Sequence, residues 1–121
     1  MRFLIVDDSS TMRRIIINTL SKLGQHEYVE AGNGNEGLER LSAGPIDFVI
    51  TDWNMPEMSG IEFIRAVRAN EQTKRLPVLM VTTNAAEEDI VDAMKAGVNN
   101  YVVKPFTPDT IRGKIQAALH A

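Results

Sequence analysis

The chain has 121 residues, 44% of them apolar and 24% charged, with a formal net charge of −3. This length suits one domain around one hydrophobic core, and the small acidic excess argues against a nucleic-acid-binding surface, which needs a basic stripe. The absence of cysteine excludes disulfides, thiolate chemistry and cysteine-based metal sites.

Five short apolar runs, each followed by a segment with apolar residues at helical spacing, make up the chain. The runs that predict strands are 3–6, 28–31, 46–50, 78–81 and 101–103. The helical segments are 12–23, 36–43, 61–67, 87–96 and 108–119. Three runs are apolar throughout, as in parallel strands that are covered on both faces. The alternation predicts an α/β domain over residues 1–121, a (βα)5 three-layer sandwich with a central parallel sheet.

Local signals mark the ends of several helices. Gly24 and Gly97 suit helix stops, Ser59 suits the cap of the third helix, and Thr107 with Pro108 suits the start of the last. The first helix is expected to place five apolar residues on one face: Met12, Ile15, Ile16, Leu20 and Leu23.

The opening segment MRFLIVDDSS has four apolar residues before two acids, unlike a secretory signal. No apolar stretch approaches the ~20 residues that span a bilayer. We therefore expect a cytoplasmic monomer that binds neither membrane nor nucleic acid.

Polar residues lie just past four of the five predicted strands. They are Asp7 and Asp8, Asp52, Thr82 and Thr83, and Lys104. Because the carboxyl ends of parallel strands share one edge of a sheet, these side chains should converge there. Singly, an aspartate here suits a helix cap, Thr82 a strand residue and Lys104 a solvated lysine. Their common edge favours a functional site.

Three carboxylates at one edge repel one another. The repulsion energy of two unit charges 4 Å apart is about 4 kcal/mol in an effective dielectric near 20. Either one carboxylate takes up a proton or a cation lies among them. Oxygen ligands favour a hard ion, and Mg²⁺ typically binds carboxylates together with phosphate. A carboxylate beside Mg²⁺, a lysine and a threonine hydroxyl predicts phosphoryl transfer to that carboxylate.

At these residues the sequence resembles the receiver domains of two-component response regulators. The match comprises VDDS (6–9), DWNMPEMSG (52–60), VTT (81–83) and KPF (104–106), in order along the whole chain. Within that family, SSTMRRII (9–16) and GVNNYVVKPFTP (97–108) are similar to the single-domain chemotaxis regulators. The resemblance implies a flavodoxin-like fold with sheet order 2-1-3-4-5.

The resemblance also implies roles at the metal and phosphate site. Asp52 would accept a phosphoryl group from a CheA-like histidine kinase. Asp8, Asp52 and the backbone carbonyl of Asn54 would bind Mg²⁺, with Asp7 acting through water. Asn54 would also tune the lifetime of the acyl phosphate, on which a phosphatase could act as well.

Further roles follow from the same resemblance. Thr82 would hydrogen-bond the phosphoryl group, Lys104 would pair with it, and the Lys104–Pro105 bond would be cis. Asn84, like Asn54, would tune phosphate lifetime. Tyr101 would rotate inward when Thr82 moves.

An output face is expected around the fourth helix, the fifth strand and the fifth helix. In similar proteins that face binds the flagellar motor switch protein FliM. The residues expected to line it are Ile90, Met94, Tyr101 and Lys114. Arg13 and Arg14, in contrast, are interpreted as helix surface rather than as a kinase-docking site.

Three alternatives to a chemotaxis switch stay open. A stand-alone receiver in a phosphorelay, or one that controls another output, would have the same site. A phosphatase with an aspartyl nucleophile usually carries a second acid where this chain has Asn54. A flavodoxin-like electron carrier would need a hydroxyl- and glycine-rich loop after the first strand. We therefore expect a signalling switch, phosphorylated on itself, rather than an enzyme.

Overall fold

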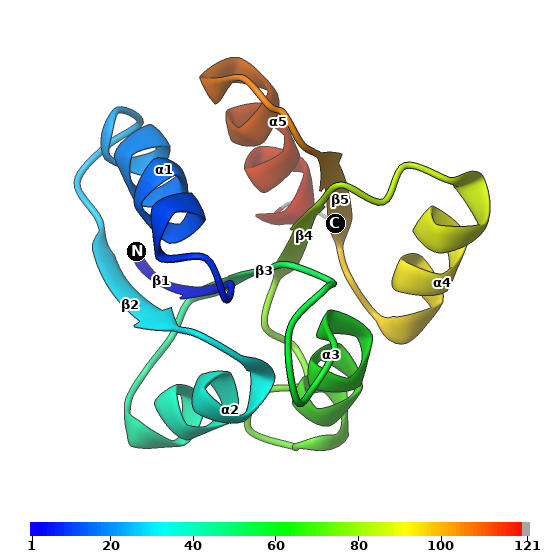
Figure 1. Cartoon of the computed structure of the whole chain (residues 1–121). Helices are drawn as coiled ribbons and strands as arrows, with labels where there is room; N and C mark the ends of the chain where they lie inside the picture. The colour runs from blue at the N-terminus through cyan, green and yellow to red at the C-terminus, as the bar shows by residue number, and fades with distance from the viewer. Residues whose placement is uncertain (120–121) are drawn as a thin grey trace.

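The computed structural model describes residues 1–119, in which five strands alternate with five helices (Figure 1). The strands are β1 (Arg2–Val6), β2 (Glu27–Ala31), β3 (Phe48–Thr51), β4 (Val78–Thr82) and β5 (Asn100–Val103). The helices are α1 (Ser10–Ser21), α2 (Gly34–Ala43), α3 (Gly60–Ala69), α4 (Glu87–Ala96) and α5 (Pro108–Leu119). The predicted order of elements is confirmed.

Several predicted boundaries differ from the observed ones by one or two residues, and the start of β3, at Phe48 and not at Ile46, has a clear cause. Asp47 is exposed and pairs with the start of β1 instead of continuing a buried strand. Its N–H donates to the Arg2 carbonyl at 2.8 Å, and its carboxylate accepts from the Arg2 N–H at 2.8 Å.

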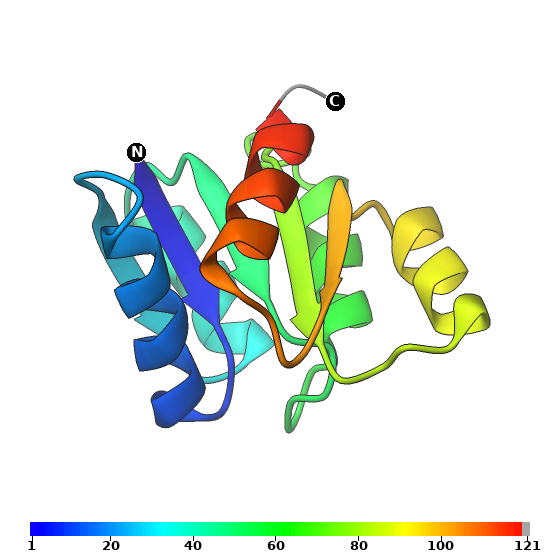
Figure 2. The ribbon, with the colours of Figure 1, turned by 90° about the horizontal axis from the view of Figure 1, so that it is seen from above.

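The sheet is parallel throughout, with the strand order β2-β1-β3-β4-β5 that was predicted. Helices α1 and α5 cover one face, and α2, α3 and α4 cover the other (Figures 1 and 2). β3 lies at the centre between β1 and β4, and the side chains of these three strands are buried on both faces, except for Arg2 at the start of β1. The (βα)5 three-layer sandwich is therefore confirmed.

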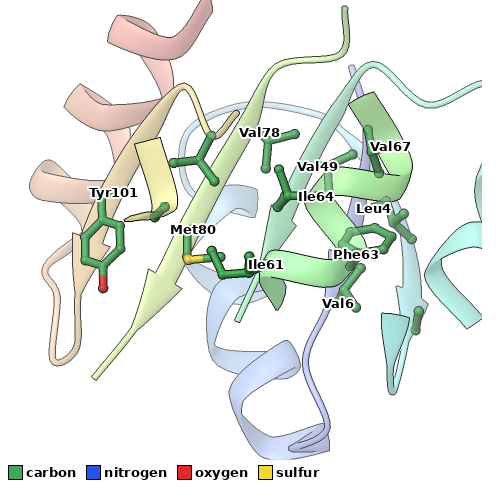
Figure 3. Close-up of a cluster of buried hydrophobic side chains, with 13 residues drawn as sticks. Leu4, Val6, Val49, Ile61, Phe63, Ile64, Val67, Val78, Met80 and Tyr101 are labelled. Atoms are coloured by element: carbon green, nitrogen blue, oxygen red, sulfur yellow. The ribbon is translucent and has the colours of Figure 1, made fainter. Parts of the chain in front are cut away.

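The core consists of two clusters, one on each face of the sheet. Beneath α2, α3 and α4, residues such as Leu4, Val49 and Phe63 pack together, and Tyr101 lies at the β5 end of this cluster (Figure 3). The other cluster packs α1 and α5 against Phe3 and other sheet residues. Both clusters consist almost wholly of apolar side chains, whose burial stabilises the fold by roughly 25 cal/mol per Å².

Not every apolar helix residue faces the core. On α1, Ile16 and Leu20 are buried, whereas Ile15 is 44% exposed, so the expectation of Ile15 on the buried face is wrong. On α4, Val91 and Met94 are 44% and 46% exposed. Isolated exposed apolar residues are ordinary, but Val91 and Met94 lie together on one helix.

The predicted caps of α3, α4 and α5 are present, whereas the predicted stop at Gly24 is wrong, because α1 ends at Ser21 with Lys22 as its C-cap. The Ser59 side chain accepts from the Glu62 N–H, and the Glu62 carboxylate accepts from the Ser59 N–H, which forms a capping box. The Thr107 hydroxyl accepts from the Thr110 N–H at 3.2 Å, and Gly97 ends α4 with φ +116°. In contrast, α4 begins after Ala86, which offers no side-chain cap.

Arg68, on α3, ties together the loops at the edge where the strands begin. Its guanidinium donates to the carbonyls of Gly97, Lys74 and Leu76 and to the side chain of Asn99, at 2.6–3.0 Å. Burial lowers the pKa of Arg68 from its ordinary value. These hydrogen bonds hold the loops that precede β4 and β5 against α3.

The strands point toward the opposite edge, where the loops after β1, β3, β4 and β5 gather (Figure 2). This is the edge at which ligands bind in open parallel sheets. Across residues 1–119 we find no helix that is long and apolar enough to cross a membrane.

Candidate functional site

Asp52 follows β3 directly and is held from three sides. Its N–H donates to the Val6 carbonyl at 2.9 Å, and its own carbonyl accepts from the Thr51 hydroxyl at 2.9 Å. One carboxylate oxygen, Oδ1, accepts from the Trp53 N–H at 2.7 Å. Asp52 is 9% exposed, so its carboxylate is held in one orientation at the edge of the sheet.

Asp7 and Asp8 follow β1 and lie beside Asp52. Asp7 is buried, and its Oδ1 accepts from the Ser9 N–H at 2.9 Å. Asp8 is exposed. A carboxylate oxygen from each of Asp7, Asp8 and Asp52 lies within 4.8 Å of the other two, so the predicted convergence of the three acids is present.

Lys104 reaches both buried acids from the end of β5. Its Nζ lies 3.3 Å from Asp7 Oδ2 and 3.5 Å from Asp52 Oδ2. The Lys104–Pro105 peptide is cis, as predicted. Burial raises the pKa of Asp7, although the Ser9 N–H and Lys104 act against the rise and Asp52 adds to it. One lysine therefore leaves the three-acid group with an excess of negative charge.

This donor set fits a hard divalent cation. All three side chains offer oxygen ligands, and a cation would offset the charge that Lys104 leaves unpaired. The residue group Asp7, Asp8 and Asp52 is the one such cluster within residues 1–119. Oxygen donors of this kind suit Mg²⁺ better than a softer transition metal.

The chain matches the family described as response regulator receiver domain over residues 3–116. The chain belongs to this family. A chemotaxis protein CheY from Pseudomonas aeruginosa is 55% identical over 116 residues, which cover 96% of this chain and 94% of the relative. Chemotaxis protein CheY1 from Helicobacter pylori is 50% identical over 120 residues, with 98% and 97% covered.

The solved structure of Vibrio cholerae chemotaxis protein CheY4 is similar to this receiver domain with a TM-score of 0.89. The two sequences are 37% identical, and the match covers 97% of each chain. Fold and family are therefore shown together, and the acidic edge described above lies inside the matched residues.

Two asparagines of the receiver domain meet at the rim of the site. Asn54 Nδ2 donates to Asn84 Oδ1 at 3.2 Å, which joins the loop after β3 to the loop after β4. Thr82 is fully buried at the end of β4, and its hydroxyl oxygen accepts from the Asn84 N–H at 3.3 Å. The two residues predicted to tune phosphate lifetime thus contact each other.

Tyr101 is buried in the receiver domain, with 6% of its surface exposed. Its hydroxyl donates to the backbone carbonyl of Asn84. The Tyr101 ring is therefore oriented inward in this structure. That it rotates inward in response to a movement of Thr82 stays a prediction. Through Asn84, Tyr101 is linked to Asn54 by two successive hydrogen bonds.

Gly60 has a role that sequence patterns alone did not indicate. A Cβ on this residue would lie 2.2 Å from the Asp52 carbonyl oxygen and 2.8 Å from the Trp53 Cα. The Gly60 N–H donates to the Trp53 carbonyl at 2.7 Å. Only glycine allows α3 to begin this close to the backbone of Asp52.

Arg13 also differs from its sequence interpretation as helix surface. Its side chain is 18% exposed, and it donates to the backbone carbonyl of Asp7 at 2.6 Å and to the Glu30 carboxylate at 2.9 Å. Arg14, by comparison, is exposed as predicted. The contact of Arg13 depends on β2 lying next to β1.

The surroundings of Tyr101 predict an alkaline loss of stability. Burial, with smaller effects of Asp89 and Asp52, raises the pKa of Tyr101 from 10.0 to about 12. Above pH 10 the unfolded chain releases this proton while the folded chain keeps it, so the free energy of unfolding falls as pH rises toward 12.

Denaturant unfolding at several pH values checks this prediction. Near pH 11, Tyr101 should account for about 1 kcal/mol of the stability lost since pH 9. Tyr101→Phe keeps the ring and removes the titrating hydroxyl, so its stability should fall less over the same interval. An equal loss in both proteins would contradict the assignment.

Proposed function

We propose that this receiver domain is a chemotaxis response regulator of the CheY type, switched by Mg²⁺-dependent phosphorylation of Asp52. The observation that supports it best is the group of three carboxylates and Lys104 around one fixed acceptor. The names of the relatives at 50–55% identity support the chemotaxis assignment.

In this proposal two of the three acids bind the metal directly and the third binds it through water. Asp8 and Asp52, with the backbone carbonyl of Asn54, would hold Mg²⁺, and Asp7 would act through water. Bound Mg²⁺ would supply positive charge to the phosphoryl oxygens. Asp7 would also hold Lys104, whose Nζ lies between Asp7 and Asp52, in place for the incoming phosphoryl group.

The chemistry is a transfer between a histidine nitrogen and a carboxylate oxygen. A carboxylate oxygen of Asp52 attacks phosphorus, the bond from phosphorus to the imidazole nitrogen of a CheA-like kinase breaks, and its electron pair returns to the imidazole. A carboxylate nucleophile, unlike a hydroxyl, carries no proton that a neighbouring base must remove. Lys104 and the Thr82 hydroxyl would stabilise charge on the phosphoryl oxygens.

The acyl phosphate is removed when water attacks phosphorus and the carboxylate of Asp52 leaves. Asn54 and Asn84, which bond to each other at the rim, would set how easily water reaches that position. A phosphatase would act at the same rim. The domain thus catalyses no turnover of an external substrate in this proposal.

The output face would lie over α4, β5 and α5. Met94 is exposed and Ile90 and Lys114 are partly exposed, whereas Tyr101 is buried. Such a face fits an apolar stripe of a partner helix. We propose a FliM-like flagellar motor switch protein as that partner, with the protein acting as a cytoplasmic monomer.

Trp53 offers a direct test, because its N–H bonds to Asp52 and its ring lies against the core. Its fluorescence should change when Mg²⁺ is added, and again when beryllofluoride, a mimic of the phosphoryl group, is added with Mg²⁺. The response to beryllofluoride should be absent when Mg²⁺ is left out. An unchanged signal in both steps would contradict an active receiver.

A matched control separates the acidic site from general salt effects. Asp92 is an exposed carboxylate on α4. Asp92→Asn should respond to Mg²⁺ and beryllofluoride as the wild type does, whereas Asp8→Asn should lose most of the Mg²⁺ response. Equal behaviour of the two variants would show that the response does not arise at the acidic edge.

A further inference from the structure

We propose that Arg13 is a positioning residue that orients the peptide between Asp7 and Asp8 and thereby strengthens binding of Mg²⁺ at the acidic edge. The inference rests on the proposed function, because it concerns the same metal site. It assigns a role to a side chain on α1 that does not itself offer a metal ligand.

The geometry begins with a bridge between two strands. The Arg13 guanidinium donates from Nη1 to the Asp7 carbonyl at 2.6 Å and from Nε to the Glu30 carboxylate at 2.9 Å. Asp7 directly follows β1, and Glu30 belongs to β2. Since both donors come from one planar group, fixing one contact also orients the other.

Arg13 completes the bonding of Asp7. The Asp7 N–H donates to the Ala31 carbonyl at 3.1 Å, Oδ1 accepts from the Ser9 N–H, and Oδ2 faces Lys104. The carbonyl is the remaining polar group of this buried residue, and Arg13 is its donor. All polar groups of Asp7 are then held in one arrangement.

The Asp7 carbonyl lies in the same rigid peptide plane as the Asp8 N–H. Asp8 is exposed, and among residues 1–119 its carboxylate has no hydrogen bond or ion pair that would hold it. The peptide plane that Arg13 orients is therefore the main constraint on where the Asp8 carboxylate projects. A small rotation of that plane would move one of the three converging acids away.

Loss of the Arg13 guanidinium has two opposite expected effects on the affinity for Mg²⁺, one from its charge and one from its hydrogen bonds. A guanidinium near the acidic edge repels Mg²⁺, so loss of its charge alone would tighten metal binding. Loss of the bond to the Asp7 carbonyl would weaken binding, because the acids are less well placed. Glu30 lies 2.9 Å from Arg13 and offsets much of its charge, so geometry should prevail.

The test is a Mg²⁺ titration of the full chain, followed by Trp53 fluorescence. Arg13→Gln should weaken Mg²⁺ binding about tenfold, within the range found for residues behind metal ligands. Arg14→Gln removes the same charge from the next, exposed residue and should bind as the wild type does. Arg13→Lys keeps the charge but cannot bridge both partners, so it should bind more weakly than the wild type.

Three outcomes overturn the proposal in distinguishable ways. Unchanged binding in Arg13→Gln means that Arg13 is only structural, and tighter binding means that its charge dominates. A wild type that shows no Mg²⁺ response overturns the proposed function, and this inference with it. If Arg13→Gln fails to fold, Arg13→Lys decides the question: it keeps the charge, so weaker Mg²⁺ binding supports the positioning role and unchanged binding overturns it.

Discussion

Asp52→Asn is expected to keep the fold and to form no acyl phosphate. Asparagine has nearly the same shape, and its Oδ1 can still accept the 2.7 Å hydrogen bond from the Trp53 N–H. Its amide nitrogen cannot replace the second carboxylate oxygen, which lies 3.5 Å from Lys104 Nζ. The nucleophile is thus removed while the packing of β3 and α3 stays.

Mass spectrometry after incubation with Mg²⁺ and a small phosphodonor measures this effect. The wild type should gain one phosphoryl group, and Asp52→Asn should gain none, which is a complete loss rather than a partial one. Asp92→Asn, an equal change of charge on α4, should be phosphorylated normally. Phosphate on the Asp52→Asn protein would show that another residue is the nucleophile.

The same variant tests the output half of the proposal. A peptide from a FliM-like switch protein should bind phosphorylated wild type more tightly than unphosphorylated wild type. Asp52→Asn should bind at the lower level under both conditions. If phosphorylated wild type shows no gain, a receiver in a phosphorelay, or one with another output, becomes the better interpretation.

Gly60→Ala is expected to have the largest effect on stability. The added methyl carbon would lie 2.2 Å from the Asp52 carbonyl oxygen and 2.8 Å from the Trp53 Cα, both backbone atoms that cannot rotate away. Overpacking of this kind costs about 3 kcal/mol, and more where the backbone cannot shift. The displacement would also move Asp52 and weaken the Mg²⁺ response of Trp53.

Gly113→Ala is a matched control with an expected effect of opposite sign. Gly113 lies within α5, and a Cβ there would meet nothing within 4 Å. Alanine in an exposed helix should stabilise the protein by about 0.5–1 kcal/mol. Denaturant unfolding compares both variants with the wild type. Destabilisation of similar size in both would contradict a specific contact at Gly60.

Much of the site could be predicted because it follows from topology alone. Once the strands are parallel, the residues directly after β1, β3 and β5 lie at one edge of the sheet, where the long side chain of Lys104 can reach the two acids. Lys104 Nζ accordingly lies 3.3 Å from the Asp7 carboxylate and 3.5 Å from that of Asp52. Helix caps such as Ser59 were predictable because they depend on neighbours a few residues away.

The features that sequence reasoning missed depend on distant partners. The contact of Arg13 with Glu30 requires β2 to lie beside β1, which periodicity does not reveal. Three consecutive isoleucines, residues 15–17, leave the buried face of α1 ambiguous, and the sheet covers Ile16 rather than Ile15. Gly60 matters through its approach to Asp52, eight positions away and on the other side of a turn.

The hydrogen bonds of Arg68 have a mechanical consequence for the output face. They attach the Gly97 end of α4 to α3, whereas the opposite end, after Ala86, has no side-chain cap. A helix of this length is about 15 Å long. We therefore expect α4 to rotate about its Gly97 end. A small displacement near Asn84 would then move the uncapped N-terminal end of the helix furthest, and the exposed Val91 would move with it.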